Sequence, residues 1–148
     1  MRKILLAALA ATALATPAYA QTQTAAAEPR SFVGTWGFQS EDYGTDDYGL
    51  AMSGVAVITQ AQGTHYNVRL LTQQQLTERE SGEQHMLVAH ENCSGDASNG
   101  QLAITCQADP LQERQPDTFL LQQGDNADQL VGAITSSSNS QTTFSRLP

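Results

Sequence analysis

The sequence predicts an all-β domain, an eight-stranded antiparallel barrel of up-and-down topology with one disulfide-stapled hairpin. Eight short segments alternate apolar and polar side chains with a period of two, and turn residues separate most of them. No stretch of the mature chain keeps the sustained apolar stripe of a long helix. Eight strands are enough to close a barrel, which would remove the exposed edges of an open sheet. A β-sandwich is the alternative fold.

The best-defined hairpin turns at Asn99-Gly100, because a type I′ turn needs positive φ at both central positions. That turn places Cys93 directly opposite Cys106 in a non-hydrogen-bonded pair, where cross-strand side chains are closest. The two cysteines are therefore predicted to form a disulfide, which would close a loop of about 14 residues. A reactive thiol or a zinc ligand is the alternative, although no CxxC spacing occurs.

The chain begins with the features of a secretory signal peptide. Two cationic residues precede an apolar run over 4–15, and small residues before position 21 predict cleavage after Ala20. We therefore expect a signal peptide over 1–20, a flexible arm over 21–30 and one barrel domain over 31–148. The mature protein is expected to be periplasmic or secreted, with no membrane insertion. Such an oxidising compartment agrees with the predicted disulfide.

The charge balance excludes several classes of partner. The formal net charge is −8, and removal of Arg2 and Lys3 with the signal peptide lowers it to −10. Nucleic acids and anionic membranes need a basic patch, so neither is expected as a partner. The mature chain has no lysine, which excludes a Schiff-base mechanism.

No catalytic motif is present in the sequence: Gly-x-Ser-x-Gly, His-Glu-x-x-His and a phosphate-binding loop are all missing. We therefore expect no enzymatic activity, no cofactor and no metal. Acid–base or metal chemistry would fit best at one cluster of acids and a histidine, for which ordinary surface charge is the alternative: Glu78, Glu80, Glu83 and His85.

The predicted strands cover residues 32–38, 53–59, 64–72, 85–92, 101–107, 117–123, 129–136 and 141–147. A hairpin turning at Gln62-Gly63 predicts three inward-facing pairs: Val57 with Val68, Val55 with Leu70, and Thr59 with Tyr66. A β-bulge is expected near Glu91, because this acid otherwise shares the face of Cys93. The polar stretch 73–83 is interpreted as a long connection or an extension of its flanking strands, and 108–116 as a loop.

The two ends of the domain resemble a known family. Gly34-Thr35-Trp36 resembles the Gly-x-Trp opening of lipocalins and related calycin barrels, in which the Trp packs at the closed end of the barrel under an Arg from near the last strand. Arg146, in Phe144-Ser145-Arg146, occupies the corresponding place. The resemblance implies a lipocalin-like barrel in which the Arg146 guanidinium stacks on the Trp36 indole.

A loop over 40–49 repeats Asp-Tyr-Gly and interleaves carboxylates with aromatic rings. Its candidate ligand-binding residues are Asp42, Tyr43, Asp46, Asp47 and Tyr48. We expect a non-catalytic binding protein for a small apolar or amphipathic ligand, with this loop at the barrel mouth. The alternative is that residues 40–49 form a plain solvated acidic loop that binds nothing. The binding hypothesis fails if the interior is filled by Trp36, Phe38, Tyr66, Phe119 and Phe144, which would leave no cavity of roughly 300 Å³.

The alternative function is an envelope protein that binds a protein partner or inhibits a protease. In size, export and single disulfide the chain is similar to the small barrel inhibitors of serralysin-type metalloproteases, whose N-terminal arm enters the protease cleft. Residues 21–30 would be that arm. The disulfide departs from that family's pattern, because it staples a hairpin in the middle of the chain and does not begin just after the Trp strand.

Overall fold

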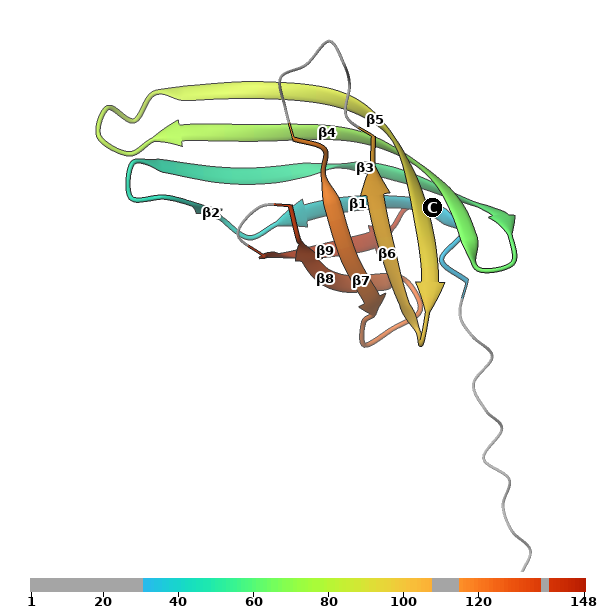
Figure 1. Ribbon diagram of the computed structural model, residues 1–148. Coiled ribbons are helices and arrows are strands. Elements are labelled where there is room, and N and C mark those ends of the chain that lie inside the picture. Colours follow the sequence, from blue (N-terminus) through green and yellow to red (C-terminus); the bar gives the residue numbers. More distant parts are fainter. Residues whose placement is uncertain (1–30, 108–114, 137–138) are drawn as a thin grey trace, which may run out of the picture.

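The computed structural model describes residues 31–107, 115–136 and 139–148, which form a closed antiparallel barrel (Figure 1). The predicted signal peptide, the arm and most of the 108–116 loop lie outside these residues. No helix long and apolar enough to cross a membrane occurs in the described part of the chain. The strands are β1 (Gly34–Ser40), β2 (Tyr43–Gly44), β3 (Tyr48–Gln62), β4 (His65–Glu78), β5 (Gln84–Ser98), β6 (Gln101–Cys106), β7 (Thr118–Gln123), β8 (Gln129–Ile134) and β9 (Ser140–Arg146).

Strand β1 closes the barrel by pairing on both sides. The sheet runs in the order β1-β9-β8-β7-β6-β5-β4-β3-β2, and β1 pairs with β3 as well as with β9. All pairings are antiparallel, and from β3 to β9 each strand lies beside the next one in the chain. Eight strands therefore form the predicted up-and-down barrel, with β2 attached outside it, and the β-sandwich is excluded.

Aromatic side chains fill the part of the barrel that β1 encloses. The rings of Phe38 and Phe144 stack with centroids 4.7 Å apart, and Phe119 meets both rings edge-on. Gly54 makes room for this cluster, because an added Cβ would lie 2.8 Å from the Phe38 ring. Around the cluster, the largest fully buried apolar side chains are Trp36, Met52, Ile58, Val68, Leu102, Ile104, Leu121, Leu130 and Ile134.

The expected stack of Arg146 on Trp36 is present at one end of the barrel. Trp36 is fully buried, and its indole N–H donates to the Phe32 carbonyl at 3.0 Å. The guanidinium carbon of Arg146, directly opposite on β9, lies 4.2 Å from the centre of the Trp36 ring. Arg146 also donates to the Val33 carbonyl at 2.7 Å and forms an ion pair with Asp128 at 3.1 Å. This end of the barrel is therefore sealed by a cation–π stack.

The stapled hairpin has the predicted register. Asn99 and Gly100 have φ values of 51° and 79°, as a type I′ turn requires. Cys93 lies opposite Cys106 with their Cα atoms 3.9 Å apart, and the two form a disulfide. The Cys106 N–H donates to Asp117 on the other side, so the cysteine pair is the non-hydrogen-bonded kind. The disulfide is compatible with an oxidising, exported environment.

The predicted register of the β3–β4 hairpin is wrong by one residue. Val68 lies opposite Ile58, and the register shifts at a bulge between Gln60 and Gln62. A slip of one residue moves every side chain to the other face. Ala56 and Ile58 therefore point into the barrel, whereas Val57 is 40% exposed on the outside.

The predicted bulge near Glu91 is absent, because β4 and β5 pair without a register shift. Glu91 stays on the inner face, where it is half-buried. Its carboxylate accepts the Asp117 N–H at 3.4 Å and the Thr72 hydroxyl at 3.5 Å. These hydrogen bonds offset the cost of turning an acid inward, so the strand needs no bulge.

Replacement of both cysteines by alanine should lower the free energy of unfolding by about 2–4 kcal/mol, because the denatured chain loses its cross-link. Urea denaturation of the Cys93→Ala/Cys106→Ala variant measures this loss. The wild-type protein in reducing buffer should lose a similar amount. An equal midpoint for wild type in oxidising and reducing buffer would show that the bond does not form.

Arg146→Lys should lower the free energy of unfolding by about 1–2 kcal/mol, since a lysine keeps the charge but lacks the planar group that stacks on Trp36. Trp36 is the single tryptophan, so its fluorescence reports both unfolding and the loss of the stack. Arg69→Lys is the matched control, because Arg69 is exposed on the barrel wall. Equal stability of the two variants would contradict a structural role for the stack.

Candidate binding site

Strands β3, β4 and β5 continue well beyond the closed part of the barrel. The β1–β3 pairing ends at Ser53, and the β5–β6 pairing begins only at Cys93. We call β2 together with residues 48–52, 73–78 and 84–91 the extension. It projects from the barrel as a short curved sheet with β5 along its outer side (Figure 1). The expectation that 73–83 could extend its flanking strands is confirmed, with a turn between Glu78 and Gln84.

The inner face of the extension continues the barrel interior and carries a group of apolar side chains. By strand alternation it carries Leu50, Leu76 and Leu87, which follow the buried Met52 and Ala89 out of the barrel. Leu50 and Leu76 lie opposite each other and are half-buried. Leu87 is 46% exposed. The extension therefore offers apolar side chains that the described residues do not fully cover.

A hydrogen-bonded polar pair is set into this face, which by strand alternation also carries Glu78, His85 and Glu91. Tyr43 is buried, with 8% of its surface exposed, and pairs with Leu50 across the β2–β3 ladder. Its hydroxyl accepts a hydrogen bond from the side-chain amide of Gln74 at 2.9 Å. The face thus combines aliphatic area with a hydroxyl and an amide, the combination that an amphipathic ligand needs.

The structure separates the five residues predicted to bind a ligand. Tyr43 lies on the inner face, whereas Asp46, Asp47 and Tyr48 are exposed at the β2–β3 turn. Asp42 lines a groove of about 270 Å³ on the outer face. Tyr43 and Gly44 form β2, which pairs with β3 as a short edge strand.

The β2–β3 turn is held by two hydrogen bonds from Arg79 and by one within the turn itself. The Arg79 guanidinium donates to the Thr45 carbonyl at 3.0 Å, and the Arg79 backbone N–H donates to the Asp47 carbonyl at 2.8 Å. The Thr45 hydroxyl accepts the Tyr48 N–H at 3.2 Å. These bonds fix the acidic turn at the tip of the extension.

The cluster of acids and a histidine lies at the β4–β5 turn. His85 and Glu83 form a pair at 3.2 Å, with both side chains about 60% exposed. The Glu78 carboxylate accepts a hydrogen bond from Ser81. Within the described residues, the only side chains close enough together to hold a metal ion are those of Glu91, Cys93 and Cys106. The two cysteines form a disulfide, so they have no thiolate to bind a metal.

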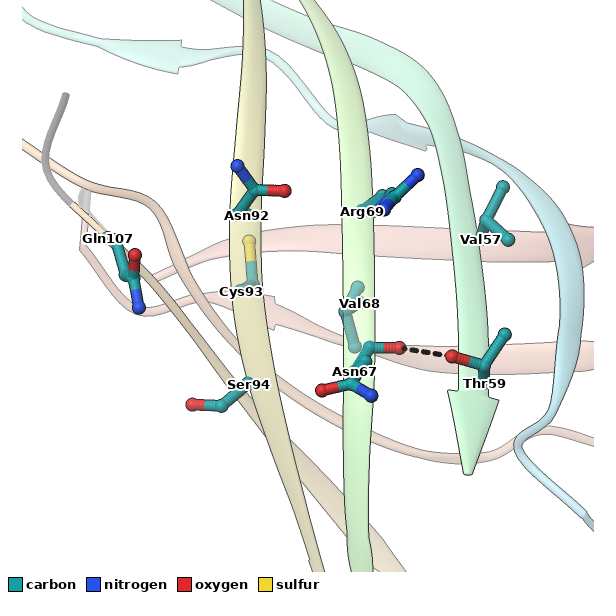
Figure 2. A pocket seen from close by; sticks show the side chains of 9 residues that line it. All are labelled: Val57, Thr59, Asn67, Val68, Arg69, Asn92, Cys93, Ser94 and Gln107. Atoms are coloured by element: carbon teal, nitrogen blue, oxygen red, sulfur yellow. Dashed lines mark hydrogen bonds between the residues drawn. The ribbon is translucent and has the colours of Figure 1, made fainter. Parts of the chain in front are cut away.

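A polar groove of about 520 Å³ crosses the outside of β3, β4 and β5 (Figure 2). Two cross-strand rows form its floor, Val57-Arg69-Asn92 and Thr59-Asn67-Ser94. Figure 2 shows amides, hydroxyls and one guanidinium spread along it. The sequence prediction missed this groove, because the register error placed Val57 and Thr59 inside the barrel.

The sequence matches no protein-family model and no curated protein. The placement of the side chains in the fold is therefore the basis for assigning a function. The structure offers an apolar inner face, a polar outer groove and an acidic tip, all on β2 to β5.

Tyr43→Phe should lower the free energy of unfolding by about 1 kcal/mol, because the Gln74 amide loses its acceptor. Tyr48→Phe is the matched control, since Tyr48 is 42% exposed at the turn. Chemical denaturation of the two variants checks the difference. Equal stability would contradict the placement of Tyr43 on the inner face.

Proposed function

We propose that this protein is an exported, non-catalytic binding protein that holds a small apolar or amphipathic ligand on the inner face of the extension. The observation that carries the proposal is Leu87, which is 46% exposed on a face that continues the barrel core. Aliphatic side chains left open beside a polar pair favour a ligand with an apolar body and a polar group.

The packing of the barrel favours the extension over the interior as the binding site. Phe38, Phe119 and Phe144 are at most 5% exposed and contact one another, so they occupy the space in which a lipocalin-type ligand would lie. Eight-stranded barrels either fill with side chains or hold one ligand, and these rings support the first case. The ligand then needs a surface outside the closed barrel.

Three features support export and a lipocalin-like origin. Residues 1–20 have the charged, apolar and small-residue regions of a signal peptide. The Cys93–Cys106 disulfide fits an oxidising compartment. The stack of Arg146 on Trp36 is the arrangement that the Gly-x-Trp resemblance implies. Together they support a small barrel of the lipocalin type in the periplasm or outside the cell.

The charges at the tip favour a neutral or cationic polar group on the ligand. Asp46 and Asp47 are exposed at the β2–β3 turn, and the chain carries a net charge of −8. An anionic head group would be repelled there. In this proposal Tyr43 contacts the ligand beside Leu50, while Asp42 and Tyr48 lie at the rim.

A second candidate function is the binding of a protein partner of the cell envelope. The specific observation in its favour is the outer edge of β5, where Met86 and Val88 are exposed. That edge is a different surface from the inner face. Residues 21–30, the arm that would enter a protease, lie outside the described residues.

The neutral fluorescent probe N-phenyl-1-naphthylamine should bind the wild-type protein saturably, and Leu87→Gln should weaken it about five- to tenfold, the cost of losing part of one leucine contact. Met86→Gln is the matched control, because Met86 is the next residue on the strand but faces the outside. Fluorescence titration gives the three dissociation constants. Equal weakening by both variants, or no saturable binding, would overturn the proposal.

A further inference from the structure

The outer edge of β5 presents backbone groups that no described strand pairs. The Ala97 N–H donates to the carbonyl of Thr64, the residue directly before β4, so odd-numbered residues of β5 bond toward β4. The Asn92 carbonyl accepts the Gln107 N–H, so even-numbered residues bond toward the other side. The β5–β6 ladder begins at Cys93. The N–H and C=O groups of Met86, Val88 and His90 therefore point away from the sheet along this edge.

The side chains along the same edge are apolar and exposed. Met86 is 60% exposed and Val88 53%. Proteins ordinarily protect such an edge with lysine, proline or a bulge. Here the β4–β5 register has no bulge, and residues 84–90 contain neither lysine nor proline. The edge therefore lacks these protecting features and can accept another strand.

Acidic side chains lie at one end of this edge. Glu80 and Glu83 are exposed at the β4–β5 turn, directly before β5 begins at Gln84. A strand added antiparallel to β5 would run toward this turn, so its C-terminal end would approach the two carboxylates. Cationic residues at that end would gain from the charge, whereas acidic ones would be repelled.

We propose that the β5 edge over 84–90 binds an extended segment of a partner polypeptide as an additional antiparallel strand, with apolar residues against Met86 and Val88 and Arg or Lys at its C-terminal end. Main-chain hydrogen bonds supply the affinity, and the side-chain pattern supplies the specificity. A second copy of this chain fits less well, since it would bring together two mature molecules that each carry a formal charge of −10. This inference rests on the second candidate function, which it makes specific, and it concerns a different surface from the small-ligand site.

The test uses a fluorescein-labelled peptide, Ser-Val-Thr-Val-Thr-Val-Arg-Arg, titrated with the full mature protein. Val88→Pro should weaken binding at least about tenfold, because proline removes an outward N–H and leaves the bonds to β4 intact. Val88→Thr, which keeps that N–H and the side-chain shape, should stay within about threefold of wild type. Replacing the two arginines of the peptide by glutamates should weaken binding at least about tenfold.

A peptide with N-methylated valines, titrated with the wild-type protein, tests the same hydrogen bonds without altering β5, so the result stands even where Val88→Pro does not fold. Equal affinity of the plain and N-methylated peptides, or no binding up to about 1 mM, would overturn the proposal. Concentration-dependent dimerisation that Val88→Thr keeps and Val88→Pro abolishes would assign the edge to a second copy instead. Leu87→Gln tests the inner face separately, so the two proposals can fail independently.

Discussion

Strand β1 is hydrogen-bonded on both sides, to β9 and to β3, and this double pairing limits the height of the closed barrel. β1 has 7 residues and β6 has 6, whereas β3, β4 and β5 have 14 or 15. The long strands lie in the closed wall only where β1 or β6 pairs with them. The short closed section fills with aromatic rings and is sealed by Trp36 and Arg146. The remaining length of β3 to β5 has to leave the barrel, and it forms the extension.

The extension restores what barrel closure removes. A closed barrel has no free strand edge and no open core face, which suits stability. The extension has two edges and an inner face continuous with the core. β2 covers the β3 edge, while the β5 edge keeps Met86 and Val88 exposed. Stability therefore resides in the barrel, whereas the surfaces able to bind a ligand or another chain lie on β2 to β5.

Local turn chemistry decided which parts of the fold the sequence could predict. Asn99-Gly100 admits one tight turn, so the disulfide register followed from it. The Gln62-Gly63 turn carries a bulge between Gln60 and Gln62, and no side chain there indicates it. Because of that bulge Val57 faces outward, and the sequence did not predict the outer groove that it lines. The polar composition of 73–83 fits a connection as well as a strand. The sequence therefore predicts the extension only as one of two alternatives. Tyr43 is a predicted ligand residue, but the sequence did not predict that it lies apart from the acidic turn. That separation depends on β2, a strand of two residues that is too short to show an alternating pattern.

Backbone NMR of the isotopically labelled mature protein, titrated with N-phenyl-1-naphthylamine, tests the central claim most directly: ligands bind the extension and not the barrel interior. The account predicts chemical-shift changes at residues 48–52, 73–78 and 84–90, with the Trp36 indole N–H and the amides of Phe119 and Phe144 unchanged. Shift changes centred on Phe119 and Phe144 would contradict it, because they would place the ligand inside the barrel.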